Sequence, residues 1–191
     1  MDKYPLVLQN SWVYGSVISS IDIGKTYFDP VLVKNFVKDN KTVDEKTPIL
    51  RIFQFLKITK DDGMSAILND SSHKILCKFT YKCCKEFERI YRQRITFQTL
   101  HCLLLINTAH LRFIDKSDLN RDFDTFNVNF DVIVLEVNDC TIFNHDRTDL
   151  PLSVEKSLKF IYDESPYKTA CGPRHINDED NYSDDDEIKS L

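Results

Sequence analysis

The alternation of apolar and polar residues predicts β-strands through the middle of the chain. In residues 50–59, one face would carry Leu50, Ile52, Leu56 and Ile58, and the other Arg51, Phe53, Phe55 and Lys57. Such a period of two is typical of a strand, because successive side chains point to opposite faces. Further strands are expected at residues 64–69, 73–79, about 100–106 with a continuation at 111–114, and about 131–137.

Two short turns and one helix connect these strands. Lys60–Gly63 contains Asp-Gly, which tolerates the positive φ of a tight hairpin, and Asp70–Ser72 offers side-chain oxygens to nearby backbone amides. Residues 81–92 have helical spacing, with an apolar stripe that includes Phe87. Five strands with a helix between the third and fourth follow the order of an OB barrel. We therefore predict a mainly β fold with flanking helices, built on a five-stranded OB-fold barrel (β-β-β-α-β-β).

Three regions are expected along the chain. Residues 1–48 would form a partly helical amino-terminal extension, with short helices at 12–21 and 30–39. Residues 49–163 would form the barrel, closed by a carboxy-terminal helix over 150–162. Residues 164–191 would be an acidic, disordered tail.

Charge is concentrated at the carboxy terminus. Residues 174–191 hold seven acids against two bases, which accounts for the net charge of −5, so the rest of the chain is neutral. Such a segment has little to bury and is expected to be disordered. It would act as a solubilising tail or as a contact for a basic partner.

The six cysteines are expected to be buried free thiols in a reducing compartment. No CxxC pair occurs, and the amino terminus lacks a basic region followed by a long apolar run, so no secretory signal is expected. Apolar runs are about five residues long, far short of the roughly 20 that a membrane helix needs. No membrane association is predicted.

OB barrels bind polymers or other proteins and seldom catalyse reactions, which leaves two alternatives open besides protein binding. The face with Arg51, Phe53, Phe55 and Lys57 alternates cations with stacking platforms, as single-stranded nucleic-acid readers do. The neutral body argues against it, because phosphates require several unopposed cations. An enzyme is not expected: no nucleophile–base–acid set or metal-ligand spacing is present, and neighbouring His101 and Cys102 would point to opposite faces. No cofactor or metal is therefore predicted.

Several short segments resemble one protein family. They are Ile67-Leu68-Asn69-Asp70-Ser71-Ser72-His73-Lys74-Ile75-Leu76, Phe87-Glu88-Arg89, Arg94-Ile95-Thr96 and Cys140-Thr141-Ile142-Phe143. Together they resemble the family of the third "Ever Shorter Telomeres" protein, a small OB-fold regulatory subunit of telomerase in budding yeasts. The resemblance is clearest over residues 50–148, and Ser11-Trp12-Val13 is similar to a motif near the family's amino terminus. The family is similar to the OB domain of the animal shelterin protein that recruits telomerase.

The resemblance implies a non-catalytic telomerase subunit that promotes telomere maintenance at chromosome ends in the nucleus. Its expected partners are the amino-terminal region of the telomerase reverse transcriptase and a second telomerase regulatory subunit. Direct contact with telomeric single-stranded DNA is expected to be weak.

The resemblance also implies roles for individual residues. A structural ion pair is expected between Asp70 and Arg94. The expected partner-binding residues form a mixed-charge polar patch, namely Trp12, Lys57, Glu88, Thr99, His101, Asp146 and Thr148.

Plainer roles stay open for some of them. Glu88 could pair with Arg92 four residues on. Trp12 could anchor a partner or pack the extension onto the barrel. Thr99 and His101 would share the exposed face of the fourth strand, although His101 departs from the small amide that the family has there.

Overall fold

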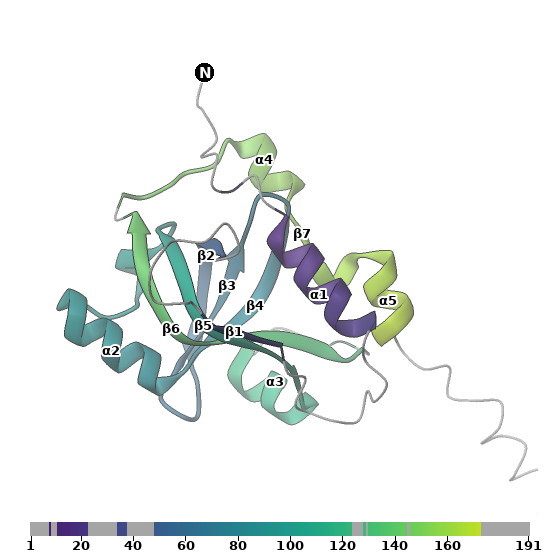
Figure 1. Ribbon diagram of the computed structural model, residues 1–191, viewed down its shortest axis with the longest axis horizontal. Helices are drawn as coiled ribbons and strands as arrows, with labels where there is room; N and C mark the ends of the chain where they lie inside the picture. Colours follow the sequence, from purple (N-terminus) through teal and green to yellow (C-terminus); the bar gives the residue numbers. More distant parts are fainter. Residues whose placement is uncertain are drawn as a thin grey trace, which may run out of the picture.

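The computed structural model describes residues 8, 11–22, 34–37, 48–123, 128, 130–144 and 146–172. Five long strands form its barrel: β2 (Ile49–Ile58), β3 (Met64–Asn69), β4 (His73–Phe79), β5 (Leu103–Ile114) and β6 (Val132–Asn144). β2–β3, β3–β4 and β5–β6 pair antiparallel, β4 pairs parallel with β6, and β2 pairs with β5 to close the barrel (Figure 1). The predicted five-stranded OB order is confirmed, with α2 (Tyr81–Tyr91) between the third and fourth barrel strands.

The predicted hairpin and the helix after β4 are confirmed in detail. The Thr59 amide donates to the Gly63 carbonyl over 3.0 Å, and Asp62 adopts a φ of 61°. A Cβ at Gly63 would lie 2.3 Å from the carbonyl oxygen of Phe79, so this turn needs glycine to approach β4. α2 begins after Thr80, whose hydroxyl accepts a bond from the Cys83 amide. This cap fixes where the helix starts.

The last two barrel strands, β5 and β6, are longer than the pattern predicts, whereas β3 and β4 have the predicted bounds. β5 is one continuous strand, where two pieces were expected, and β6 extends seven residues past the predicted end at Val137. β5 pairs with β6 along its whole length, and its other edge pairs with β2 at residues 103–105 and with β1 (Lys34–Val37) at residues 108–111. The expected helix at 30–39 is therefore wrong for residues 34–37, which the free edge of β5 holds as a strand. The rest of that predicted helix lies outside the described residues.

The helices that flank the barrel differ from the prediction at the carboxy-terminal end. α1 (Trp12–Asp22) is confirmed, whereas the closing helix is only α4 (Leu152–Ser157). The chain then becomes extended because β7 (Lys159–Phe160) pairs with the start of β4. It continues through η3 (Ile161–Asp163) into α5 (Ser165–Cys171), which occupies the start of the predicted tail. Residues 173–191 lie outside the described part, and the predicted boundaries at 48 and 163 stay predictions.

One core joins the barrel to α1 and α5, which lie beside each other in Figure 1. Val13, Val17, Tyr162 and Tyr167 are fully buried within it. Two further elements that were not predicted are α3 (Lys116–Phe123) between β5 and β6, and η2 (Phe97–Thr99) before β5. The six cysteines are free thiols, and five of them are buried, as predicted. None of the helices in the described residues is long and apolar enough to span a membrane.

Candidate partner-binding surface

Asp70 is buried and connects α1, through hydrogen bonds, to the turn that links β3 to β4. The residue is 1% exposed, and its Oδ2 accepts a hydrogen bond from the Val13 amide of α1 over 2.8 Å. Oδ1 accepts the amides of Ser72 and His73, both over 2.9 Å. Three backbone donors, one of them at a positive helix amino terminus, thus satisfy the carboxylate without a cation.

Arg94 does not pair with Asp70 in the described structure. Its side chain is 79% exposed, and its Nε lies 3.9 Å from Oε2 of Glu88 on α2. The expected Asp70–Arg94 ion pair is therefore absent from the described residues, because one amide of α1 and two amides of the turn supply the donors that the arginine was expected to supply. Glu88 likewise pairs with Arg94 and not with Arg92, whose backbone amide ends α2 on the Glu88 carbonyl.

Arg51 ties together the segments before β5 and after β6. It is fully buried, and its Nε donates to the Thr148 carbonyl over 2.7 Å while Nη1 donates to Asn69 Oδ1 over 3.2 Å. The Thr148 amide in turn donates to the His101 carbonyl, and the His101 amide donates to Ile52, both over 2.9 Å. The predicted nucleic-acid face is wrong at Arg51, because its guanidinium is buried and donates hydrogen bonds to groups inside the protein.

His101 lies in a left-handed turn before β5 and not on the strand itself. Its φ is 65°, and its Nδ1 lies 3.1 Å from Oδ1 of Asp149, which also accepts from Nε of Arg147 over 2.7 Å. Burial and the nearby Arg51 charge lower the pKa of His101, so its ring is neutral at neutral pH. Hydrogen bonds from Arg147 and His101 lower the pKa of Asp149. The charge on the surface around His101 therefore comes mainly from Asp149 and Arg147.

Thr99 does not lie on the surface. It is 1% exposed at the end of η2, and its hydroxyl donates to the Thr96 carbonyl over 2.7 Å. The expected exposed strand edge is wrong because β5 begins only at Leu103, so residues 97–101 turn before the strand starts. Thr99 can support the shape of this turn, but the described fold does not offer its side chain to a partner.

The remaining candidates lie at separate places on the barrel. Asp146 is exposed in the loop after β6. Burial, and to a smaller extent the Asp146 charge, raises the pKa of the Cys102 thiol. Trp12 is half-buried at the start of α1 and packs against the core. Lys57 lies near the far end of β2, six residues from Arg51 and so about 20 Å along the strand. The structure thus brings together His101 and Thr148, and it separates Lys57 from them.

Sequence reasoning missed Arg51, Asn69 and Asp149 in this arrangement. Their contacts cross 18 to 97 residues, and alternation along one strand carries no information about such partners. The only local signal is the Arg147–Asp149 spacing, which places opposite charges two residues apart in a loop. Within the described parts of the chain, no group of His, Cys, Asp or Glu side chains is arranged to hold a metal ion.

Comparison with known proteins decides the family. Residues 9–159 match the family model described as "Shelterin complex subunit, TPP1/ACD". The chain is 37% identical over 178 residues to the telomere replication protein EST3 of Debaryomyces hansenii, covering 92% of this chain and 87% of the relative. The chain belongs to the EST3 family. The resemblance seen in the short sequence segments is confirmed.

Two further EST3 proteins extend the comparison. The EST3 of Candida albicans is 34% identical over 172 residues, or 89% of this chain and 80% of that protein. A solved structure described as the Est3 telomerase subunit of the yeast Hansenula polymorpha superposes with a TM-score of 0.52 at 26% identity. That match covers 65% of this chain and 72% of the solved one, and it agrees with the OB barrel found here.

Proposed function

We propose that this chain is a non-catalytic subunit of telomerase that promotes telomere maintenance at chromosome ends in the nucleus. The observation that carries the proposal is the 37% identity to an EST3 protein, which extends over 92% of this chain, together with the shared barrel. In this proposal the chain binds the amino-terminal region of the telomerase reverse transcriptase and a second regulatory subunit. The reverse transcriptase supplies the chemistry, and this chain needs no cofactor.

The environments of Cys102 and His101 support a binding role for this chain over a catalytic one. Burial and the Asp146 charge raise the pKa of the Cys102 thiol, which makes it a poor nucleophile. The neighbouring His101 backbone bonds Ile52 and Thr148, and its ring faces Asp149. These groups hold the barrel end in shape.

We place the contact with the reverse transcriptase on the exposed charges that flank this barrel end. Glu88 with Arg94, and Asp146 in the following loop, are open to a partner, while His101 and Thr148 shape the surface between the strands. Trp12, at the start of α1, is a separate candidate contact in this proposal. A charged rim of this kind contributes specificity and association rate.

Lys57 belongs to a different contact in this proposal. It lies near the opposite end of β2, next to Ile58, whose side chain is 66% exposed. We assign Lys57 and the exposed Ile58 to the contact with the second regulatory subunit. Two separate surfaces would allow one barrel to bridge the reverse transcriptase and another subunit.

Binding of the purified chain to the isolated amino-terminal region of the reverse transcriptase tests this proposal. Glu88→Lys and Asp146→Lys should each weaken the affinity at least tenfold, about 1.4 kcal/mol, measured by biolayer interferometry. Both positions are at the surface, so circular dichroism should show a folded protein.

The matched control is Asp163→Lys, a charge reversal at an exposed position on η3. It should bind as the unaltered chain does. Equal weakening by all three reversals would show only a general effect of charge, and unchanged binding in the Glu88 and Asp146 variants would reject the proposed contact.

A further inference from the structure

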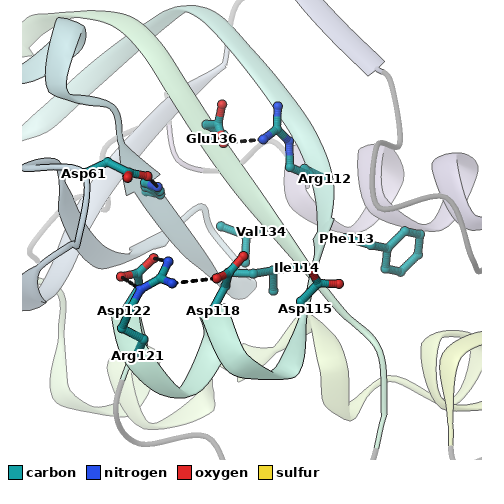
Figure 2. A pocket seen from close by; sticks show the side chains of 11 residues that line it. Asp61, Arg112, Phe113, Ile114, Asp115, Asp118, Arg121, Asp122, Val134 and Glu136 are labelled. Carbon is teal, nitrogen blue, oxygen red and sulfur yellow. Dashed lines mark hydrogen bonds and ion pairs between the residues drawn. The ribbon is translucent and has the colours of Figure 1, made fainter.

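A solvent-accessible pocket of about 290 Å³ lies at the end of the barrel where α3 is found. Figure 2 shows side chains from the Thr59–Gly63 hairpin, β5, β6 and α3 converging on it. Its charged lining consists of Asp61, Lys78, Arg112, Asp115, Asp118, Arg121, Asp122 and Glu136. None of the candidate partner-binding residues described above is among them.

Each positive charge of this pocket is already paired with a carboxylate of the same pocket. Lys78 lies 2.9 Å from Asp61, and Arg112 lies 3.4 Å from Glu136. Arg121 lies 2.8 Å from Asp118 and 3.1 Å from Asp122 (Figure 2).

Negative charge remains in excess once these pairs are formed. Five carboxylates face three cations, so the pocket carries a net charge of −2. Asp115 is exposed, and it takes part in none of the ion pairs found among the described residues. A phosphate would meet no available cation here, whereas a cationic ligand would meet carboxylates on several sides.

The walls of the pocket are held in place before any ligand arrives. Asp122 is 1% exposed, and its Oδ1 accepts the Lys60 amide over 3.1 Å, which fastens α3 to the hairpin. Burial raises the pKa of Asp122, but the bonds from Arg121 and the Lys60 amide outweigh it, and the pKa is lowered overall. A preformed site spends less binding energy on ordering itself.

The location of the pocket is where OB folds commonly bind ligands. The loop between the first two barrel strands and the connection between the last two are frequent binding elements of this fold. Here they are the Thr59–Gly63 hairpin and the segment that contains α3. The volume would hold about ten water molecules, below the usual range for drug-sized ligands but suited to one long side chain.

We propose that this pocket binds an arginine or lysine side chain from a basic segment of a protein partner. The guanidinium or ammonium group would lie between Asp115 and the Asp118–Asp122 side of α3, and the aliphatic stem would pack on Ile114 and Val134. This inference does not rest on the telomerase proposal, because it names the chemistry of the ligand and involves other residues.

Nuclear magnetic resonance titration of the full chain tests the inference with small probes. Nα-acetyl-arginine amide should shift the backbone amide signals of Asp115, Asp118 and Arg121 in a saturable way. Nα-acetyl-citrulline amide, which has nearly the same shape without the charge, should shift them at least fivefold less at equal concentration. Inorganic phosphate at matched ionic strength should leave them unchanged.

Asp115→Asn is the matched variant, since it removes the charge of this exposed side chain and keeps nearly its size and shape, and should leave α3 intact. It should weaken arginine binding at least threefold, while Asp163→Asn on η3 should leave it unchanged. The inference is overturned if citrulline shifts the signals as much as arginine does. It is also overturned if phosphate binds in place of arginine, or if Asp115→Asn binds arginine like the unaltered chain.

Discussion

A buried aspartate without a cationic partner explains how α1 is attached to the barrel. Asp70 receives the Val13 amide from a segment 57 residues away, in addition to two amides of its own turn. The Asp-Ser-Ser segment predicts the turn, because those side chains are known to bond local amides. It cannot predict the donor from α1, and the family resemblance implied Arg94 as the partner of this carboxylate.

Replacing Asp70 should therefore destabilise the protein far more than replacing Arg94. Asp70→Ala leaves three backbone amides without their acceptor and should cost about 3 kcal/mol in the free energy of unfolding. Arg94→Ala, at an exposed position, should cost about 0.5 kcal/mol or less. Urea unfolding of both single variants and of the double variant measures the two effects and their coupling.

A coupling energy near zero is expected between these two positions, because their side chains do not meet. A coupling above about 1 kcal/mol would restore the ion pair that the resemblance implied.

Arg51 illustrates the same limit of local reasoning. Strand alternation correctly separates it from Leu50 and Ile52, but the usual exposure of arginine places it on the solvent face. Its carbonyl partner at Thr148 comes from the loop after β6, 97 residues on. The burial of this guanidinium depends on the closed barrel.

Two tyrosine hydroxyls bond backbone groups where the pairing between β4 and β6 ends. β4 and β6 pair only over residues 77–79 and 135–137. Just outside this stretch, the Tyr162 hydroxyl accepts the Leu76 amide over 3.1 Å and donates to the Ile133 carbonyl over 2.6 Å. The Ile133 amide bonds the Tyr167 hydroxyl over 3.0 Å. η3 and α5 thus satisfy backbone groups that a longer strand pair would otherwise satisfy.

Tyr162→Phe should remove this bridge while keeping the ring in the core. It leaves a buried amide and a buried carbonyl unpaired, and the expected cost is about 1–3 kcal/mol in the free energy of unfolding. Tyr81→Phe, at an exposed position on α2, is the control and should change stability by about 0.5 kcal/mol or less.

Hydrogen exchange locates the effect of the Tyr162 change. The Leu76 amide should lose protection more than the Cys77 amide, which belongs to the stretch of β4 paired with β6. Equal protection of Leu76 in both proteins would contradict the bridging role.

Elements with a strong local signal were predictable, and elements set by pairing were not. α2 combines an apolar stripe with a Thr80 cap, so its position was predicted to within one residue. The predicted closing helix ends early because β7 pairs with β4, and the helix predicted at 30–39 is wrong at residues 34–37 because these pair with the open edge of β5 at residues 108–111. In both places a distant strand decides the structure of the segment.

At the scale of the molecule, the order of strands and the single helix between them sufficed to predict the barrel. The predicted patch is only partly an exposed surface. Thr99 is inside, Lys57 is at the other end of β2, and Glu88 and Asp146 stay open to a partner. Side-chain exposure on a closed barrel depends on how the loops cross its ends, and residue spacing alone does not contain that information.

Telomere length in cells that carry this chain as their only copy tests the account most directly. The Glu88→Lys and Asp146→Lys double variant should accumulate as a folded protein, lose co-purification with telomerase RNA, and allow telomeres to shorten over successive generations. The Asp163→Lys variant should keep telomeres at their normal length. Normal telomeres and normal telomerase association in a folded double variant would contradict the account.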